Sequence, residues 1–475
     1  MVQVRMRYSM GNSPSIRVLA ITLLISVAVS IAVAVQVSLS EITAYDVFSS
    51  NRGVAIALGN EVIYLNSSKL LAIRLKDSNV RIFSAVVGSS GSEIFLAGSY
   101  GKHPLLGVIK LDREVKTAIY ISDLINGSFF KLRIINGCLY CTGYVFNGQV
   151  YSGLIAVLNE SELIGNYSII STEASIILCK GSCYIRDITE LPGNEIVALG
   201  ACYIMSLYPK YQLMLLVLNK GLSTCRSYIL ESENSLMPKG VFVVQGNNII
   251  CVAVSENAVS YIKLTPSEIS EEGRAKISLF PLKNSLLSIM AVSGNDTVYV
   301  LTRTSGSQYI LRISPSSPAI ELTEAENANP VAVLLRNGEP VLLTCNLSGY
   351  RVESISGITR VVAPTDMEYT KLSEVRVEIK VRELILKRIK SEEMMADIVS
   401  VAPAAQGGRG GWSELITSFT TTEHIHRMEA SASVGKGFRK DVEAISLSNH
   451  YILVLSLALI SAYLLLRSRL SKTRT

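Results

Sequence analysis

The amino-acid sequence predicts an all-β protein, a β-propeller of about seven blades that terminal transmembrane helices anchor in a membrane. Three observations predict this fold class: an apolar segment near each end, short β-branched runs that recur over most of the chain, and a glycine at the same place before each run. Four short strands in about 40–55 residues, repeated six or seven times, are typical of a propeller. Two tandem β-sandwiches also give short, regularly spaced strands and are the alternative.

The two ends of the chain predict its membrane topology. Residues 18–39 are apolar and follow a basic tail, 1–17; residues 448–466 are apolar and precede a second basic tail, 467–475. Both segments approach the length that crosses a hydrocarbon core of about 30 Å. Because the positive charges lie on their outer sides, both tails are expected in the cytoplasm and the bulk of the chain outside the cell membrane. Ala32-Val33-Ala34 also fits a signal-peptidase site, so a cleaved leader is the alternative to an uncleaved anchor.

The net charge of +6 belongs to the tails, which carry seven basic residues and no acid. The chain between them is close to neutral, at about −1 by difference. The basic balance is therefore a topology signal, and nucleic acid is not expected as a partner.

The repeat within the predicted ectodomain, 40–365, consists of a glycine-containing turn, a β-branched strand and a second apolar strand. Its aligned glycines lie 44–56 residues apart: Gly91, Gly137, Gly193, Gly246, Gly294 and Gly338. A blade buries its faces only against its neighbours, so the ring has to close. Residues 42–49 are expected to complete the final blade.

The unit resembles the degenerate propeller repeats of many exported archaeal and bacterial proteins, in which a glycine-led strand precedes an apolar strand ending in Lys-Leu-Asp. The copy at 108–112, Val-Ile-Lys-Leu-Asp, has this full ending. The sole tryptophan, Trp412, lies outside the repeats, so the sequence has no Trp-Asp dipeptide and none of the tryptophan docking positions of quinoproteins. The resemblance therefore implies a fold and an exported location, and names no functional family.

After the repeats, the amino-acid composition and the pattern of apolar residues change. Residues 366–399 are expected to form a strand that turns into a helix, because alternating valines precede the helix-compatible segment 387–398. Residues 400–447 are rich in Gly, Ser, Thr and Ala and are expected to form a flexible stalk.

Eight cysteines in an exported domain indicate disulfides. Cys179 and Cys183 flank a three-residue turn that would bring them within bridging distance, with both thiols free as the alternative. Cys202 and Cys225, on sequential predicted strands of one blade, are a second candidate pair. Cys138 and Cys141 form a Cys-x-x-Cys, but residues three apart in a strand point to opposite faces, so buried strand cysteines are expected there and not a metal site.

The other motifs in the sequence indicate few functional sites. Six Asn-x-Ser/Thr sequons are glycosylation candidates, with unmodified loop asparagines as the alternative: Asn66, Asn126, Asn159, Asn166, Asn295 and Asn346. His424 and His426 form a His-x-His in the predicted stalk, where a solvated pair is expected. The sequence has no phosphate-binding loop, nucleophile elbow or metal-ligand helix, so no cofactor, metal ion or catalytic residue is predicted.

These observations predict a membrane-tethered binding or scaffold protein that presents its propeller to a protein or glycan partner at the cell surface. An exported hydrolase acting on glycans or peptides is the first alternative, and a structural component of the cell envelope is the second. A deep channel lined by convergent carboxylates would favour the hydrolase.

Overall fold

The computed structural model describes residues 44–403, interrupted by short gaps. Apart from one short helix, α2 (Glu160–Ile164), the regular elements of these residues are β-strands, which confirms the all-β prediction. No helix among the described residues has the length and apolar character needed to span a bilayer. The predicted membrane segments, both tails and most of the predicted stalk lie outside the described residues.

The strands form seven antiparallel groups that follow one another in chain order. The first three groups are β1 (Asp46–Ser50), β2 (Gly53–Leu58), β3 (Glu61–Leu65) and β4 (Lys69–Leu75); β5 (Val80–Val87), β6 (Glu93–Tyr100), β7 (His103–Leu111) and β8 (Val115–Ile121); and β9 (Asn126–Ile135), β10 (Cys138–Phe146), β11 (Tyr151–Asn159) and β12 (Ile169–Leu178).

The remaining groups complete the series. They are β13 (Ser182–Leu191), β14 (Glu195–Ile204), β15 (Lys210–Asn219) and β16 (Cys225–Leu230); β17 (Met237–Val244), β18 (Asn248–Val254), β19 (Ala258–Leu264) and β20 (Arg274–Pro281); β21 (Leu286–Gly294), β22 (Thr297–Thr304), β23 (Gln308–Ile313) and β24 (Ile320–Ala325); and β25 (Pro330–Arg336), β26 (Glu339–Asn346) and β27 (Gly349–Ser354).

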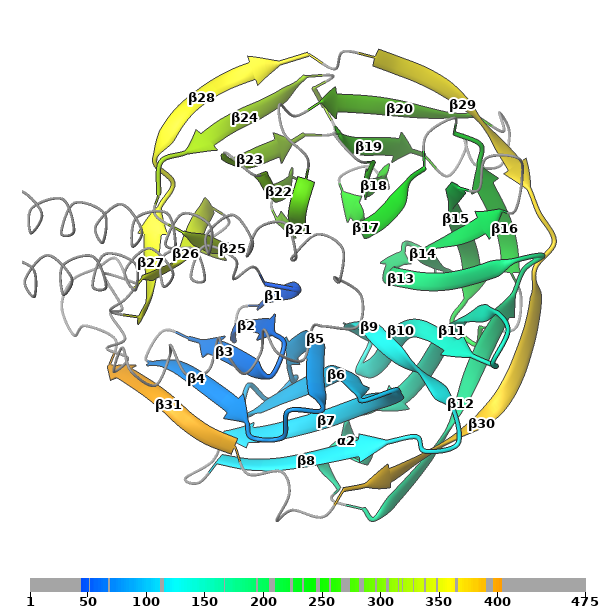
Figure 1. Ribbon diagram of the computed structural model, residues 1–475, viewed down its shortest axis with the longest axis vertical. Coiled ribbons are helices and arrows are strands. Elements are labelled where there is room, and N and C mark those ends of the chain that lie inside the picture. Colours follow the sequence, from blue (N-terminus) through cyan, green and yellow to red (C-terminus); the bar gives the residue numbers. More distant parts are fainter. Residues whose placement is uncertain are drawn as a thin grey trace, which may run out of the picture. The chain divides into compact units, whose positions relative to one another are not determined.

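The first strands of the seven groups form a closed circle. Each contacts the first strand of the next group, from β1 through β5, β9, β13, β17 and β21 to β25, and β25 contacts β1. The groups accordingly surround a common centre in Figure 1. This arrangement is compatible with the predicted propeller.

The prediction that residues 42–49 complete the final blade is wrong for residues 46–49, and residues 42 and 43 lie outside the described residues. β1 pairs with β2 in the first group, where Asp46 lies opposite Ala57. The last group has three strands, and the Ala44 N–H donates one hydrogen bond to the Val331 carbonyl, at 3.0 Å. Contact between β1 and β25, together with this hydrogen bond, therefore closes the circle.

Four C-terminal strands form an outer belt, which we define as β28 (Gly357–Val362), β29 (Asp366–Glu374), β30 (Glu378–Arg388) and β31 (Ala396–Pro403). The belt passes the groups in reverse order: β28 pairs with β24, β29 with β20 and β16, β30 with β12 and β8, and β31 with β4. Figure 1 shows it as the yellow and orange strands at the periphery. Because β29 and β30 each pair with two groups, they join neighbouring groups and cover outer edges that would otherwise lack backbone partners.

The belt corrects the prediction for residues 366–399. The segment 378–388 is strand throughout, and a further strand begins at Ala396, where a helix was expected; residues 390–395 lie outside the described residues. Ser400–Pro403 were expected to belong to the flexible stalk, but they are part of β31. The alternating valines, which indicated a strand, therefore predicted this segment better than the helical spacing did. Backbone pairing with β12 holds β30 in the extended conformation.

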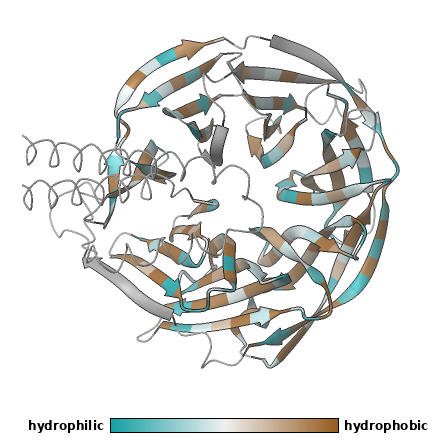
Figure 2. Ribbon diagram, viewed as in Figure 1, coloured by the Kyte–Doolittle hydropathy of each residue, from teal (hydrophilic) through white to brown (hydrophobic). Residues whose placement is uncertain are grey.

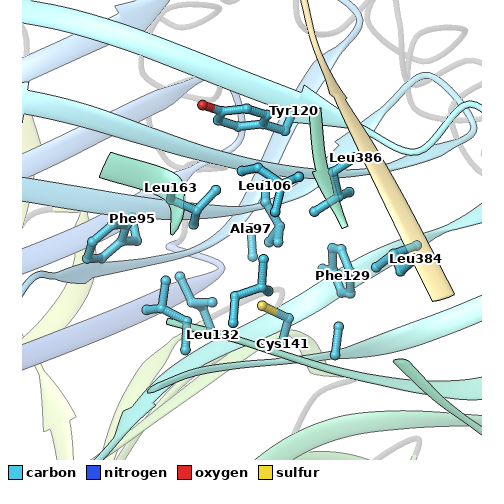
Figure 3. Packing of buried hydrophobic residues seen from close by; sticks show 14 of the residues in the cluster. Phe95, Ala97, Leu106, Tyr120, Phe129, Leu132, Cys141, Leu163, Leu384 and Leu386 are labelled. Carbon is cyan, nitrogen blue, oxygen red and sulfur yellow. The ribbon is translucent and has the colours of Figure 1, made fainter. Parts of the chain in front are cut away.

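The cores lie between successive groups. Hydrophobic and polar residues follow one another in short bands along the strands (Figure 2). Figure 3 shows the core between the second and third groups, where Phe95, Leu106 and Phe129 pack with Cys141. Leu384 and Leu386 of the belt strand β30 belong to the same cluster. The belt is thus part of the hydrophobic core as well as of the hydrogen-bonded sheets.

The predicted glycine register marks the turn between the first and second strands of a group. Gly91, Gly137 and Gly193 lie in these turns with φ of 81°, 76° and 92°, in the left-handed region that glycine adopts without a steric penalty. The aligned glycines thus identify real turns of the repeat.

Candidate functional site

A β-bulge recurs in the first strands of six groups. In each of β5, β9, β13, β17, β21 and β25 one residue in the first half of the strand is skipped in the pairing with the second strand. The skipped residues are Phe83, Phe130, Arg186, Lys239, Leu287 and Val331. Bulges redirect side chains and are frequent beside functional sites. Four successive groups therefore present an aromatic or basic side chain at the same place.

Glycines on the second strands allow three of these bulges. A Cβ on Gly98 or Gly143 would lie 1.9 Å from the carbonyl oxygen of the facing first strand, and one on Gly200 would lie 2.2 Å away. These backbones approach too closely for any side chain. The glycine on the second strand therefore leaves room for the bulge of the facing first strand, which holds Phe83, Phe130 or Arg186.

Nine aromatic rings lie in successive contact at the end of the ring where the first strands begin. Neighbouring ring centroids are 4.8–6.3 Å apart, mostly in edge-to-face or tilted arrangements. Tyr45, Tyr151 and Tyr211 are the most exposed, at 36–49%. We call this cluster the aromatic arc: Tyr45, Phe83, Phe130, Tyr144, Phe146, Tyr151, Tyr184, Tyr203 and Tyr211.

Two basic side chains accompany the arc. The Arg186 guanidinium lies 5.3 Å from the centre of the Phe130 ring, a distance that permits a cation–π contact. Lys239 occupies the next bulge, and burial together with the charge of Arg186 lowers its pKa to about 8. The bulged residue is thus aromatic in the second and third groups and cationic in the fourth and fifth.

Buried ion pairs connect the first strands beside these bulges. Asp46 of β1 pairs with Lys131 of β9 and accepts a hydrogen bond from the Ser84 hydroxyl of β5. Asp187 of β13, which is fully buried, accepts two hydrogen bonds from Arg133, at 3.2 and 3.1 Å. We call these five residues the inner ionic network.

Backbone groups complete the coordination of Asp187. The N–H groups of Ile188 and Val241 donate to it at 2.8 and 3.1 Å, and Val241 belongs to β17 of the next group. Burial alone would raise the pKa of Asp187, but the charges of Arg133 and Lys131 and the hydrogen bonds from Arg133 and the Val241 N–H outweigh burial and lower it. Burial and the charge of Arg133 lower the pKa of Lys131. The network is therefore satisfied within the protein and holds successive groups together.

A cavity of about 610 Å³ opens where the first strands end. Parts of β1, β9, β13 and β17 line it, and most of the lining side chains are apolar. Its one lining carboxylate, Glu190, pairs with Lys220 at 2.8 Å and accepts a hydrogen bond from Asn136. The hydrogen bond from Lys220 is the main cause that lowers the pKa of Glu190. Among the described residues the cavity lining contains a single carboxylate, whereas most glycoside hydrolases use a pair.

The structure brings together three of the four predicted disulfide cysteines. The Sγ atoms of Cys179, Cys183 and Cys202 all lie within 4.8 Å of one another. Cys183 and Cys202 are Cα partners on β13 and β14, and the Sγ atoms of Cys202 and Cys179 are 3.2 Å apart. Hydrogen bonds from Cys183 and Cys202 lower the pKa of Cys179 to about 4. The contact between Cys179 and Cys183 agrees with the turn that the sequence indicated, while a bond between them stays a prediction.

The strand register is incompatible with a Cys202–Cys225 bridge. The Cα partner of Cys202 on β15 is Gln212, whereas the partner of Cys225 is Leu218, six residues further along the same strand. Six residues of strand span about 20 Å, and a disulfide needs Cα atoms within about 7 Å. Adjacent strands were expected, but β15 separates the two.

Cys138 and Cys141 lie on β10 and face different clusters. Cys141 is buried in the core between the second and third groups, and Cys138 packs against the core between the third and fourth. The expectation that they point to opposite faces is confirmed.

The sequons fall in varied environments. Asn159 is exposed, and Asn66 and Asn126 are partly buried. Asn346 lies in β26, while Asn166, Asn295 and the pair His424 and His426 lie outside the described residues. Glycosylation stays a prediction at all six sequons.

Comparisons with known proteins identify no family. No family model matches the chain, and no curated protein matches it. Among solved structures, one from a structural and mechanistic study of two prolyl endopeptidases is similar at 9% sequence identity, with a TM-score of 0.33. The match covers 72% of this chain and 60% of the other, so the chain spans less than two thirds of that protein.

Proposed function

We propose that the chain is a membrane-tethered binding or scaffold protein whose seven strand groups are the blades of a β-propeller, with both tails in the cytoplasm and the propeller outside. The closed circle of first strands supports the propeller. The basic tails beside the apolar segments support the topology.

The aromatic arc is the observation that carries the binding proposal. Nine rings in continuous contact, three of them exposed, line one end of the strands beside Arg186 and Lys239. Tyrosine and arginine are enriched where proteins bind partners, because each combines a large apolar contact area with a polar group. A protein or a surface glycan fits this chemistry.

The test is binding of the purified full chain to envelope material from its own cells. Replacing Tyr45, Tyr151 and Tyr211 together by serine should weaken binding by at least about 10-fold, since central tyrosines each contribute on the order of 1–2 kcal/mol. Tyr167→Ser is the matched control, because Tyr167 is 58% exposed but precedes β12, at the opposite end of the strands. Equal losses in both variants would contradict the proposed site.

Treating the envelope material separates the two partner classes. Periodate, which oxidises sugar diols, should abolish binding to a glycan partner, and protease should abolish binding to a protein partner. Binding that neither treatment affects would contradict both.

Membrane topology has its own test. Protease added to intact cells should digest the bulk of the chain and spare the short tails, 1–17 and 467–475. Digestion of the bulk of the chain only after cell lysis would overturn the proposed location.

A further inference from the structure

We infer that Cys179, Cys183 and Cys202 form a binding site for a soft monovalent metal ion, Cu(I). The inference is independent of the proposed binding function, because it concerns the start of β13 and the end of β14 and uses no residue of the aromatic arc.

The arrangement of the three sulfur atoms fits a single ion. Metal–sulfur bonds of about 2.3 Å place the sulfurs of trigonal or tetrahedral sites about 3.8–4.0 Å apart. The three Sγ atoms lie within 4.8 Å of one another, and those of Cys202 and Cys179 are 3.2 Å apart. Shifts of less than about 1 Å would therefore satisfy the coordination geometry.

The backbone prepares this geometry. Cys183 and Cys202 face each other as Cα partners in the β13–β14 ladder. Cys179 is the first residue after β12, and Lys180 and Gly181 then lead the chain into β13. Two ligands thus stand on rigid strands and the third on a short turn, which can adjust its position as the ion enters.

A fourth sulfur lies beside the three thiols. The Met214 Sδ is 3.4 Å from the Cys202 Sγ, and Met214 is fully buried on β15. A thioether is a weak, soft donor, so it suits Cu(I) better than Zn²⁺. Zn²⁺ in structural sites takes four nitrogen, oxygen or thiolate ligands in a tetrahedron, and this cluster supplies three thiolates.

The side chains around the thiols are mostly apolar, and backbone carbonyl oxygens accept hydrogen bonds from Cys179 and Cys183. Cys183 and Cys202 are 1% and 3% exposed and belong to an apolar core that contains Ile177 and Ile185. Among the described residues, the metal-ligating side chains gathered here are cysteines alone, without a histidine or carboxylate. Cys179 is partly exposed, unlike the two buried thiols, so an ion can reach the site through it.

The experiment is an anaerobic titration of the reduced full chain with Cu(I) against a chromophoric Cu(I) chelator. The wild-type chain should bind one equivalent at this site, and X-ray absorption should show a sulfur-only shell near about 2.3 Å. Cys183→Ser and Cys202→Ser should each lower the affinity by more than about 100-fold, since losing even an outer-shell partner costs 10–100-fold. Met214→Leu, which conserves volume, should lower it by about 10-fold and keeps the inference testable if the cysteine variants fail to fold.

Cys251→Ser is the matched control, because Cys251 is equally buried but lies on β18, outside the cluster. Its affinity for Cu(I) should equal that of the wild type. Three results would overturn the inference: no stoichiometric binding, unchanged affinity in the Cys202 variant, or preference for Zn²⁺ over Cu(I). A Cys179–Cys183 disulfide in the chain as isolated from its cells would also overturn it, because that bond removes two of the three ligands.

Discussion

Asp187 should be among the most destabilising positions to substitute, because its carboxylate joins three strand groups. It accepts hydrogen bonds from Arg133 of β9 and from the backbone of Val241 of β17. Asp187→Asn keeps the shape of the side chain but leaves the guanidinium without its counter-charge. Breaking a buried ion pair in this way costs about 3–5 kcal/mol. The Arg133 side chain is 21% exposed, so water can partly solvate it, and we expect about 3 kcal/mol.

The assay is chemical unfolding of the full chain followed by near-ultraviolet circular dichroism of its tyrosines. Glu321→Gln is the matched control, because it breaks the Arg312–Glu321 pair, whose side chains are about half exposed. Exposed pairs contribute about 0–1 kcal/mol. A loss below about 1 kcal/mol for Asp187→Asn would refute the reasoning, since it would mean that water reaches the pair.

The pH dependence of the unfolding free energy of the same variant tests whether the loss of stability comes from the charge of Asp187. The folded pKa of Asp187 is lowered below its unfolded value, so its ionisation stabilises the folded state above about pH 4. This contribution is lost as the pH falls through the folded pKa. The difference in unfolding free energy between wild type and Asp187→Asn should therefore be largest near about pH 7 and shrink in acid. A difference that stays constant with pH would contradict a charge-based origin.

Two further predictions concern the belt and the basic bulges. Leu386→Ala should lower the free energy of unfolding by about 2–5 kcal/mol, because Leu386 is fully buried on β30. Val381→Ala, at a 54% exposed position of the same strand, should change it by about 0.5 kcal/mol or less. Equal effects in an unfolding titration would show that the belt does not contribute to the core. Lys239 should be acetylated efficiently near pH 8, where its amine is about half neutral, and Arg186→Gln should reduce that labelling by letting the Lys239 pKa rise toward that of an ordinary lysine. Labelling of Lys239 that begins only above about pH 10 by peptide mass spectrometry would contradict the lowered pKa.

Part of the candidate site was present in the sequence repeat. The bulged residue lies seven residues before the aligned glycine in five copies, as Phe130 does before Gly137, and eight before it in the remaining copy, Phe83 and Gly91. Aligning the copies on their glycines would therefore have placed Phe130, Arg186 and Lys239 at one common position. The bulge itself carries no sequence motif apart from the facing glycine, so the shared direction of these side chains required the structure.

The sequence by itself determined the local features: the β-strands, the glycine turns and the separation of Cys138 from Cys141 follow from residue alternation and backbone freedom, which act over a few residues. Only the tertiary structure decided which distant strands pair. The reverse path of the belt depends on backbone hydrogen bonds and packing between segments far apart in the chain, and any strand with suitable alternation could make such bonds. The meeting of Cys202 with Cys179 depends on the register of the β13–β14 hairpin. The pairing of the N-terminal strand with the last group is an error about distant segments, whereas the pairing of Cys202 with Cys225 is an error about strand order within one group. Alternation specifies which face of a strand is buried, but it does not specify which strand becomes its neighbour.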